Sequence, residues 1–300
     1  MGLGFESQRD HFYLTTNEMF KILEKTMLCP TIAEIVIEAP RVAKAALPGQ
    51  FLIIRDEENG ERIPLTISDS DPVKGTVTVV IQLIGASSHH MVEHFGAGDS
   101  YADVVGPLGN PSDFVEMSAG QLASQRYVFI AGGLGTAPVY PQAKWLHEHG
   151  VPVDVIIGAR TKDLLIYTDK LASACDNLYL CTDDGSEGFK GVGTARLEAL
   201  VADEGKTYTK CVAIGPMIMM KFATLTSMKL GIPVVVSMNS LMVDGTGMCG
   251  ACRVSVGGKT MFSCVDGPEF DGALIDWDEA MRRSRQYKPE ETAAMESYGK

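Results

Sequence analysis

The chain has 300 residues, enough for two domains or three small ones. Its formal charge of −12 at pH 7 excludes nucleic acid and anionic membranes as main partners, because both require basic protein surface. No apolar run approaches the roughly 18 residues of a membrane-spanning helix, so none is predicted.

The N-terminal residues 1–18 are polar and lack the apolar centre of a secretory signal. We interpret them as a flexible extension. Four of the seven cysteines are scattered among apolar residues and are interpreted as buried free thiols: Cys29, Cys175, Cys181 and Cys211. Free thiols without an export signal indicate a reducing compartment, and we expect a cytoplasmic protein.

The first predicted domain covers residues 19–118. Short apolar segments at 31–39, 50–56, 63–69 and 76–85 alternate with turns rich in glycine and proline. Strands at this spacing predict a small antiparallel β-barrel.

A candidate flavin site lies on this barrel. Arg62 and Thr66 follow R-x-x-x-T, one residue longer than the R-x-x-[ST] pattern found where a flavin lies on a barrel. An even step along a strand places both side chains on one face, and a guanidinium pairs well with diphosphate. The predicted FAD-binding residues are Arg62, Pro64, Leu65, Thr66, Gly85, Ser87 and Ser88. The neighbouring His89 and His90 are interpreted as solvated side chains.

The second predicted domain covers residues 119–237, where apolar strands alternate with helices. This alternation predicts an α/β domain with a parallel sheet covered on both faces. Ligands of such sheets bind at the carboxyl ends of the strands, and glycines there let a pyrophosphate approach the backbone. The predicted NAD-binding residues are Gly132, Gly133, Gly135, Thr136, Arg160, Asp183, Asp184, Gly215 and Pro216. A tight turn without ligand, a surface charge at Arg160 and a solvated turn at Asp183 and Asp184 remain the alternatives.

The third predicted segment, 238–300, contains a glycine-rich cysteine cluster and a charged tail, which is either a surface helix or a docking element. Its spacing, D-x4-C-x2-C-x11-C, matches a plant-type [2Fe–2S] loop with aspartate in the first ligand position. The predicted ligands are Asp244, Cys249, Cys252 and Cys264. Ferric iron accepts both thiolate and carboxylate. A zinc knuckle with the same donors remains the alternative, although structural zinc prefers cysteine and histidine.

The order of flavin barrel, nucleotide domain and cluster loop resembles the ferredoxin–NADP reductase superfamily. The run "MVDGTGMCGACRVSVGGKTMFSCVDGPEFDG" is similar to the small subunits of NADH-dependent reduced ferredoxin:NADP oxidoreductases, also described as sulfide dehydrogenase subunits. These are related to the electron-transfer subunits of dihydroorotate dehydrogenase, which carry cysteine where Asp244 stands.

The resemblance implies one FAD, one [2Fe–2S] cluster and an NAD(H) site. It also implies a heterodimer with a larger subunit that holds a second flavin and [4Fe–4S] clusters and reacts with ferredoxin. The implied function is electron transfer on the NADH side of an electron-bifurcating enzyme. The alternatives are an electron-transfer subunit of an NAD-dependent dihydroorotate dehydrogenase and a non-catalytic zinc or redox-sensing protein. We predict no catalytic acid or base, because hydride transfer depends on the positioning of two rings.

Overall fold

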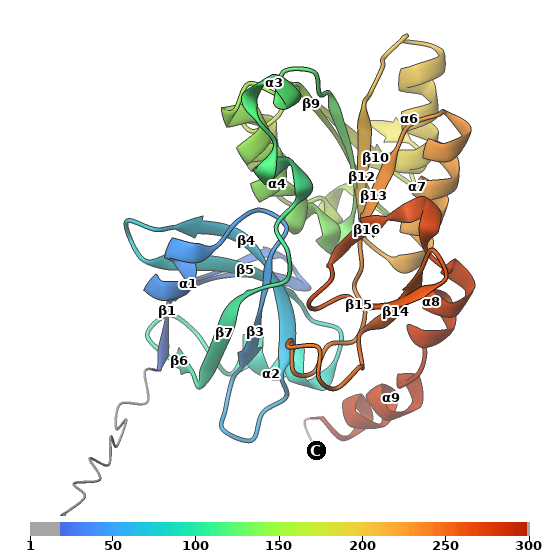
Figure 1. Cartoon of the computed structure of the whole chain (residues 1–300). Coiled ribbons are helices and arrows are strands. Elements are labelled where there is room, and N and C mark those ends of the chain that lie inside the picture. Colours follow the sequence, from blue (N-terminus) through green and yellow to red (C-terminus); the bar gives the residue numbers. More distant parts are fainter. Residues whose placement is uncertain (1–18, 299–300) are drawn as a thin grey trace, which may run out of the picture.

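A computed structural model describes residues 19–298, so the predicted extension at 1–18 lies outside the described residues. The chain forms a β-barrel, a parallel α/β sheet and a C-terminal segment that runs along both (Figure 1). This arrangement confirms the predicted fold class. The domain boundaries at residues 118 and 237 remain predictions.

The barrel is antiparallel, with strand order β6-β1-β2-β5-β4-β3-β7. Its edge strands β6 and β7 are consecutive and separated by Ala102 alone, so the chain itself joins the two edges. Alternating β-branched residues of β2 point into the core, where Ile35 and Ile37 are fully buried. The strands are β1 Phe20–Cys29, β2 Ile32–Glu38, β3 Phe51–Arg55, β4 Ile63–Asp71, β5 Thr76–Gln82, β6 Ser100–Tyr101 and β7 Asp103–Leu108, with helices α1 Pro40–Ala45 and α2 Ala86–Glu93.

The second sheet has the order β11-β10-β9-β8-β12-β13-β16 and is parallel except for β16. Its strands are β8 Tyr127–Gly132, β9 Val153–Ala159, β10 Asn177–Thr182, β11 Phe189–Lys190, β12 Lys210–Ile214, β13 Val234–Ser237 and β16 Glu269–Asp271. Because β16 comes from the C-terminal segment, that segment completes the sheet of the nucleotide domain.

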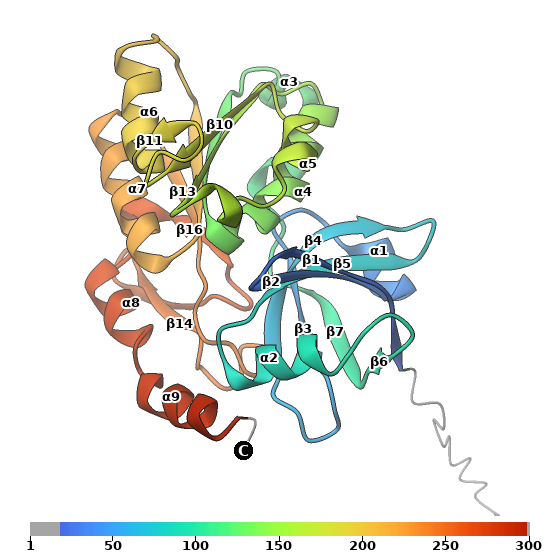
Figure 2. The same cartoon turned by 180° about the vertical axis from the view of Figure 1, so that it is seen from behind.

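Helices cover both faces of this sheet, as the near-continuous apolar strands predict (Figure 2). Helices α4 Thr136–Glu148 and α5 Thr168–Ala172 pack on one face. Helices α6 Gly193–Ala202 and α7 Met217–Lys229 pack on the other. The short helices are α3 Ala119–Leu122, η1 Asp113–Glu116, η2 Gly133–Gly135 and η3 Lys162–Leu164.

The C-terminal segment contains a two-stranded hairpin and two helices. The hairpin pairs β14 Arg253–Val256 with β15 Lys259–Phe262, and η4 Gly272–Leu274 follows β16. The charged tail forms α8 Trp277–Arg283 and α9 Lys288–Ser297, and α9 buries none of its residues. No helix within residues 19–298 is both long and apolar enough to cross a membrane.

The first prediction concerns the central strand β8. Phe129 is fully buried there and stacks on Tyr127, with ring centroids 6.2 Å apart. We expect Phe129→Ala to lower the free energy of unfolding by about 3–5 kcal/mol, because it leaves a cavity in the core. Urea denaturation measures the change, with Val73→Ala as the control, since Val73 is 95% exposed. Equal midpoints for the two variants would contradict the assigned core.

Candidate functional site

A pocket of about 550 Å³, here called the central pocket, lies between the barrel and the parallel sheet. Strand β4 contributes Pro64, Leu65 and Thr66. The sheet contributes its carboxyl ends and the turns that follow β8, β12 and β13. The predicted residues that line this pocket are Pro64, Leu65, Thr66, Gly132, Gly133, Gly135, Gly215 and Pro216. Residues from both predicted cofactor sites therefore share one cavity.

Close backbone packing explains the glycines beneath the central pocket. A Cβ on Gly135 would lie 2.1 Å from the carbonyl oxygen of Ile214, so only glycine lets this turn approach β12. A Cβ on Gly132 would lie 2.6 Å from the sulfur of Met219. The buried Thr136 donates its hydroxyl to the carbonyl of Gly133 at 2.8 Å, which fixes the turn.

Four predicted NAD residues lie outside the lining of the central pocket: the buried Thr136 described above, and Arg160, Asp183 and Asp184. Arg160, Asp183 and Asp184 are exposed, just past the carboxyl ends of β9 and β10. The Asp184 carboxylate accepts hydrogen bonds from the backbone N–H and the hydroxyl of Ser186. These bonds, led by the hydroxyl, lower the pKa of Asp184. They form a local turn, as the alternative interpretation expects.

The predicted phosphate-binding residues lie at the start of α2. The Ser88 hydroxyl accepts the backbone N–H of Gly85 at 3.0 Å and so caps the helix. Ser87 donates to Glu61. A Cβ on Gly85 would meet nothing within 4 Å, so the backbone there is open on one side.

The histidines of this helix have carboxylate partners. His89 Nδ1 lies 2.9 Å from Glu93, and His90 Nδ1 lies 2.8 Å from the buried Asp56. Both imidazoles are partly exposed and make these contacts at the surface of the barrel. Neither residue lines the central pocket.

Arg62 also lies outside the lining of the central pocket. Its Nε–H donates to the carbonyl oxygen of Val243 at 3.0 Å, and its Nη1 lies 3.4 Å from Asp103. Val243 directly precedes the predicted ligand Asp244. The side chain therefore links the barrel to the cysteine loop.

Two of the four predicted cluster ligands meet in the structure. Cys252 and Cys264 are buried free thiols with their sulfurs 3.2 Å apart. Cys249 is exposed on the same loop. The Asp244 carboxylate accepts the backbone N–H of Thr246 and of Cys249, each at 2.8 Å, and the bond from Thr246 contributes most to lowering its pKa. Among residues 19–298, no three acidic, histidine or cysteine side chains are gathered around one point.

The donor set nevertheless fits an iron–sulfur cluster. Gly245, Gly247 and Gly250 have φ of 76°, 82° and 66°, left-handed backbone conformations that let the loop turn sharply between its predicted ligands. Burial raises the pKa of the Cys264 thiol to about 12, and a metal ion overcomes such a shift by binding the thiolate. An ionised carboxylate and three thiols, two of them adjacent and buried, are ligands that iron accepts.

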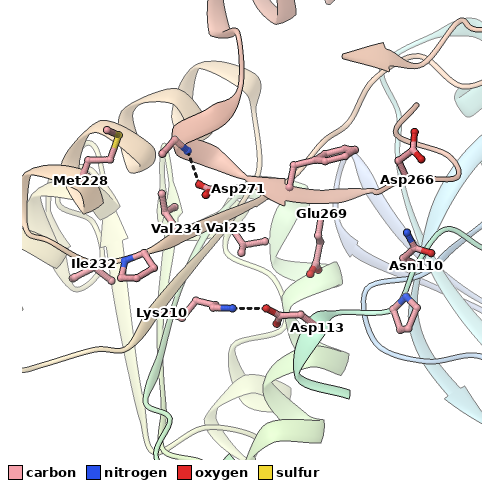
Figure 3. Close-up of a pocket in the computed structure, with 14 residues that line it drawn as sticks. Asn110, Asp113, Lys210, Met228, Ile232, Val234, Val235, Asp266, Glu269 and Asp271 are labelled. Carbon is pink, nitrogen blue, oxygen red and sulfur yellow. Dashed lines mark hydrogen bonds and ion pairs between the residues drawn. The ribbon is translucent and has the colours of Figure 1, made fainter. Parts of the chain in front are cut away.

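A second cavity of about 520 Å³, here called the side pocket, is lined by β16 and the residues beside it (Figure 3). Glu269 faces it, and so does the ion pair of Lys210 with Asp113. Glu269 Oε1 accepts the hydroxyl of Ser112 at 3.0 Å and the amide of Gln142 at 2.8 Å. Burial raises the pKa of Glu269 to about 7. The carboxyl therefore joins three parts of the chain: the barrel linker, which is the segment between β7 and β8, helix α4 and the C-terminal segment.

Sequence reasoning missed several residues that line the central pocket: Phe51, Gln82, Ser237, Met238, Asn239, Ser240, Met242 and Pro268. A signal was available for the run 237–240, because it covers the carboxyl end of the last parallel strand and the residues after it, where ligands of such sheets bind. Phe51 and Pro268 carry no local pattern, since only folding brings them to the pocket.

Residues 239–276, which include all four predicted ligands, match the family model described as the iron–sulfur cluster binding domain of dihydroorotate dehydrogenase B. A Thermotoga maritima protein named dihydroorotate dehydrogenase B (NAD(+)), electron transfer subunit homolog, is 44% identical over 278 residues, 93% of this chain and 95% of its own. The chain belongs to the family of dihydroorotate dehydrogenase B electron transfer subunits and their homologues.

The chain is also similar to the following proteins and solved structures. An uncharacterized Clostridium beijerinckii protein is 57% identical over 92% of this chain and 93% of its own. A chain in the solved structure of an NADH-dependent reduced ferredoxin-NADP oxidoreductase, reported for flavin-based electron bifurcation, has 42% identity and a TM-score of 0.86. It covers 96% of this chain and 100% of its own. The ferredoxin NADP+ reductase of Neisseria gonorrhoeae, at 17% identity, TM-score 0.56 and coverage of 71% and 90%, shares the fold alone.

The turn that contains Gly135 gives a prediction. Gly135→Ala places a methyl group against the carbonyl of Ile214, so we expect a loss of about 1–3 kcal/mol in unfolding free energy and a distorted central pocket. Differential scanning fluorimetry and FAD content measure the two effects. Gly120→Ala is the control, because a Cβ there meets nothing within 4 Å. An unchanged Gly135→Ala protein would refute the packing argument.

Glu269 gives a pH-dependent prediction. Its folded pKa of about 7 lies above the ordinary value of 4.5, so its stabilising contribution is complete below pH 4.5 and is lost as the pH rises to 7. Glu269→Gln stays neutral, and we expect it to be more stable than the wild type by on the order of 1–3 kcal/mol at pH 8. The two proteins should converge below pH 4.5 in urea denaturation. A pH-independent difference would contradict the buried carboxyl.

Proposed function

We propose that this chain moves electrons between NAD(H), FAD and a [2Fe–2S] cluster as the NADH-side subunit of an NADH-dependent reduced ferredoxin:NADP oxidoreductase. The observation that carries the proposal is the likeness to the solved oxidoreductase, at 42% identity over 96% of this chain. An electron-transfer subunit of an NAD-dependent dihydroorotate dehydrogenase is the second candidate. The family model and the name of the Thermotoga maritima relative favour that candidate.

The chain's residues divide among three cofactors in this proposal. The flavin is assigned to Pro64, Leu65 and Thr66, with Gly85, Ser87 and Ser88 near its phosphates and Arg62 at the edge of the site. NAD(H) is assigned to the turns at Gly132, Gly133, Gly135, Thr136, Gly215 and Pro216, with Arg160, Asp183 and Asp184 at the outer strand ends. The cluster is assigned to Asp244, Cys249, Cys252 and Cys264. When bound, these groups supply the hydride and single-electron chemistry that no side chain supplies.

The protein contributes position and shielding from water. Phe51, Ile214, Met238 and Met242 give the central pocket an apolar wall, which excludes water from the reacting rings. The wall also leads toward the cluster loop, because Phe51 and Met242 pack in one buried core with Cys252 and Cys264. The central pocket and the buried thiols therefore share core side chains, which supports electron transfer between the two sites.

The proposal includes a larger partner subunit that holds a second flavin and [4Fe–4S] clusters and exchanges electrons with ferredoxin. The family is named for electron transfer subunits, and a subunit requires a partner. Apolar side chains surround the cysteine loop at the surface, including Met248 at 88% exposure, Leu241 and Val243. Exposed apolar groups beside a redox site favour a protein contact there. Seven free cysteines favour a reducing compartment, and we propose the cytoplasm.

Anaerobic purification of the full chain tests the function. We expect flavin bands with broad iron–sulfur absorption, and bleaching of both on addition of NADH. The identity of the chain that co-purifies decides between the two candidate enzymes. A colourless protein that contains zinc would overturn both and leave the non-catalytic alternative.

The ligand assignment gives a separate prediction. Cys264→Ser replaces a buried sulfur next to Cys252, so we expect loss of most of the iron and of the broad absorption, while FAD remains. Cys211→Ser is the matched control, because Cys211 is also a buried free thiol but lies in β12. Iron content and visible spectra measure the outcome. Equal iron in the two variants would refute Cys264 as a ligand.

A further inference from the structure

The side chain of Arg62 crosses from the barrel to the cysteine loop. It stands immediately before β4, and its Nε–H donates to the carbonyl oxygen of Val243 at 3.0 Å. Its Nη1 lies 3.4 Å from Asp103 at the start of β7. Because Val243 precedes Asp244 in the chain, this bond fixes the peptide that leads into the first predicted ligand.

The backbone of the same loop lies against the barrel. A Cβ on Gly245 would stand 2.8 Å from the terminal carbons of Ile53 and Leu108, so the loop backbone packs directly on these two side chains of the barrel. At the far end, Asn110 donates its side-chain amide to the carbonyl of Val265 at 3.2 Å and its backbone N–H to that of Gly267 at 2.7 Å. The loop and the segment after Cys264 are therefore both tied to the flavin-binding barrel.

The contacts of Arg62 differ from those expected of an arginine that binds the diphosphate of a cofactor. Pro64, Leu65 and Thr66 line the central pocket, but Arg62 does not. Its guanidinium makes a directed bond to a carbonyl and an ion pair with Asp103, and it is about one-third exposed. A planar guanidinium held by a carboxylate is rigid enough to orient a peptide.

We propose that Arg62 is a positioning residue for the cluster: it holds the Val243–Asp244 peptide against the barrel and places a positive charge beside the cluster. The inference rests on the proposed function, because it concerns the [2Fe–2S] group assigned there. A positive charge favours the more negative reduced state, so Arg62 raises the reduction potential of the cluster. Its directed bond keeps the ligand loop in one geometry.

Three variants test this role in the full chain. Arg62→Lys keeps the charge but loses the Nε–H bond, and Arg62→Ala loses both. Arg55→Lys is the matched control, because Arg55 pairs with the same Asp103 at 3.9 Å and donates to the carbonyl of Glu58, both within the barrel. The measurements are FAD and iron content, the electron paramagnetic resonance spectrum of the reduced cluster and its reduction potential.

We expect both Arg62 variants to change the g-values or broaden the resonance lines, and Arg62→Ala also to shift the potential downward. FAD content should stay at the wild-type level, and Arg55→Lys should match the wild type throughout. Loss of FAD in Arg62→Ala with an unchanged cluster spectrum would overturn the inference and assign Arg62 to the diphosphate. An unchanged spectrum and potential in both variants, or an equal change in Arg55→Lys, would also overturn it.

Two further results keep the inference separate from the function on which it rests. Wild-type protein without iron or flavin would refute the proposed function itself. If circular dichroism shows that Arg62→Ala does not fold, Arg62→Lys, which retains the charge and most of the side-chain volume, decides through its resonance spectrum alone.

Discussion

The packing of the cysteine loop on strand β3 is the contact on which the rest of the molecule depends. Phe51 and Ile53 lie in one buried core with Met242, Cys252 and Cys264. Phe51 and Met242 also form part of the wall of the central pocket. The same side chains therefore belong both to the wall of the central pocket and to the core around two of the proposed cluster ligands. Any change in this core alters the distance between the sites, because close-packed interiors transmit displacement.

The C-terminal segment makes this contact possible by joining both domains. Strand β16 adds to the edge of the parallel sheet, while the residues before it bond to Asn110 of the barrel linker. Glu269 then accepts hydrogen bonds from Ser112 and Gln142, which come from the linker and from α4. Three parts of the chain thus meet at one carboxyl, whose burial makes its protonation part of the fold.

Local patterns were sufficient for elements whose physics is local. Short apolar strands separated by turns predicted the antiparallel barrel, and near-continuous apolar strands alternating with helices predicted the parallel sheet, which is covered on both faces. Gly132, Gly135 and Gly215 have close neighbours that leave no room for a Cβ, and Gly133 has a positive φ of 53°, so a glycine-rich turn after a parallel strand was recognisable from the sequence. The spacing of Asp244, Cys249, Cys252 and Cys264 was recognisable because a loop that binds a small cluster has a characteristic spacing of ligands.

The sequence by itself determined the type of each domain and their order, and it predicted the donor atoms for a cluster, because these follow from periodicity, turn residues and spacing. Only the tertiary structure decided which distant residues share a site. It turned Arg62 toward Val243 and brought Phe51 and Pro268 to the central pocket. It also brought Ser112 and Gln142 to the carboxyl group of Glu269. Such contacts join positions far apart in the chain, so no local pattern carries them and packing alone sets them.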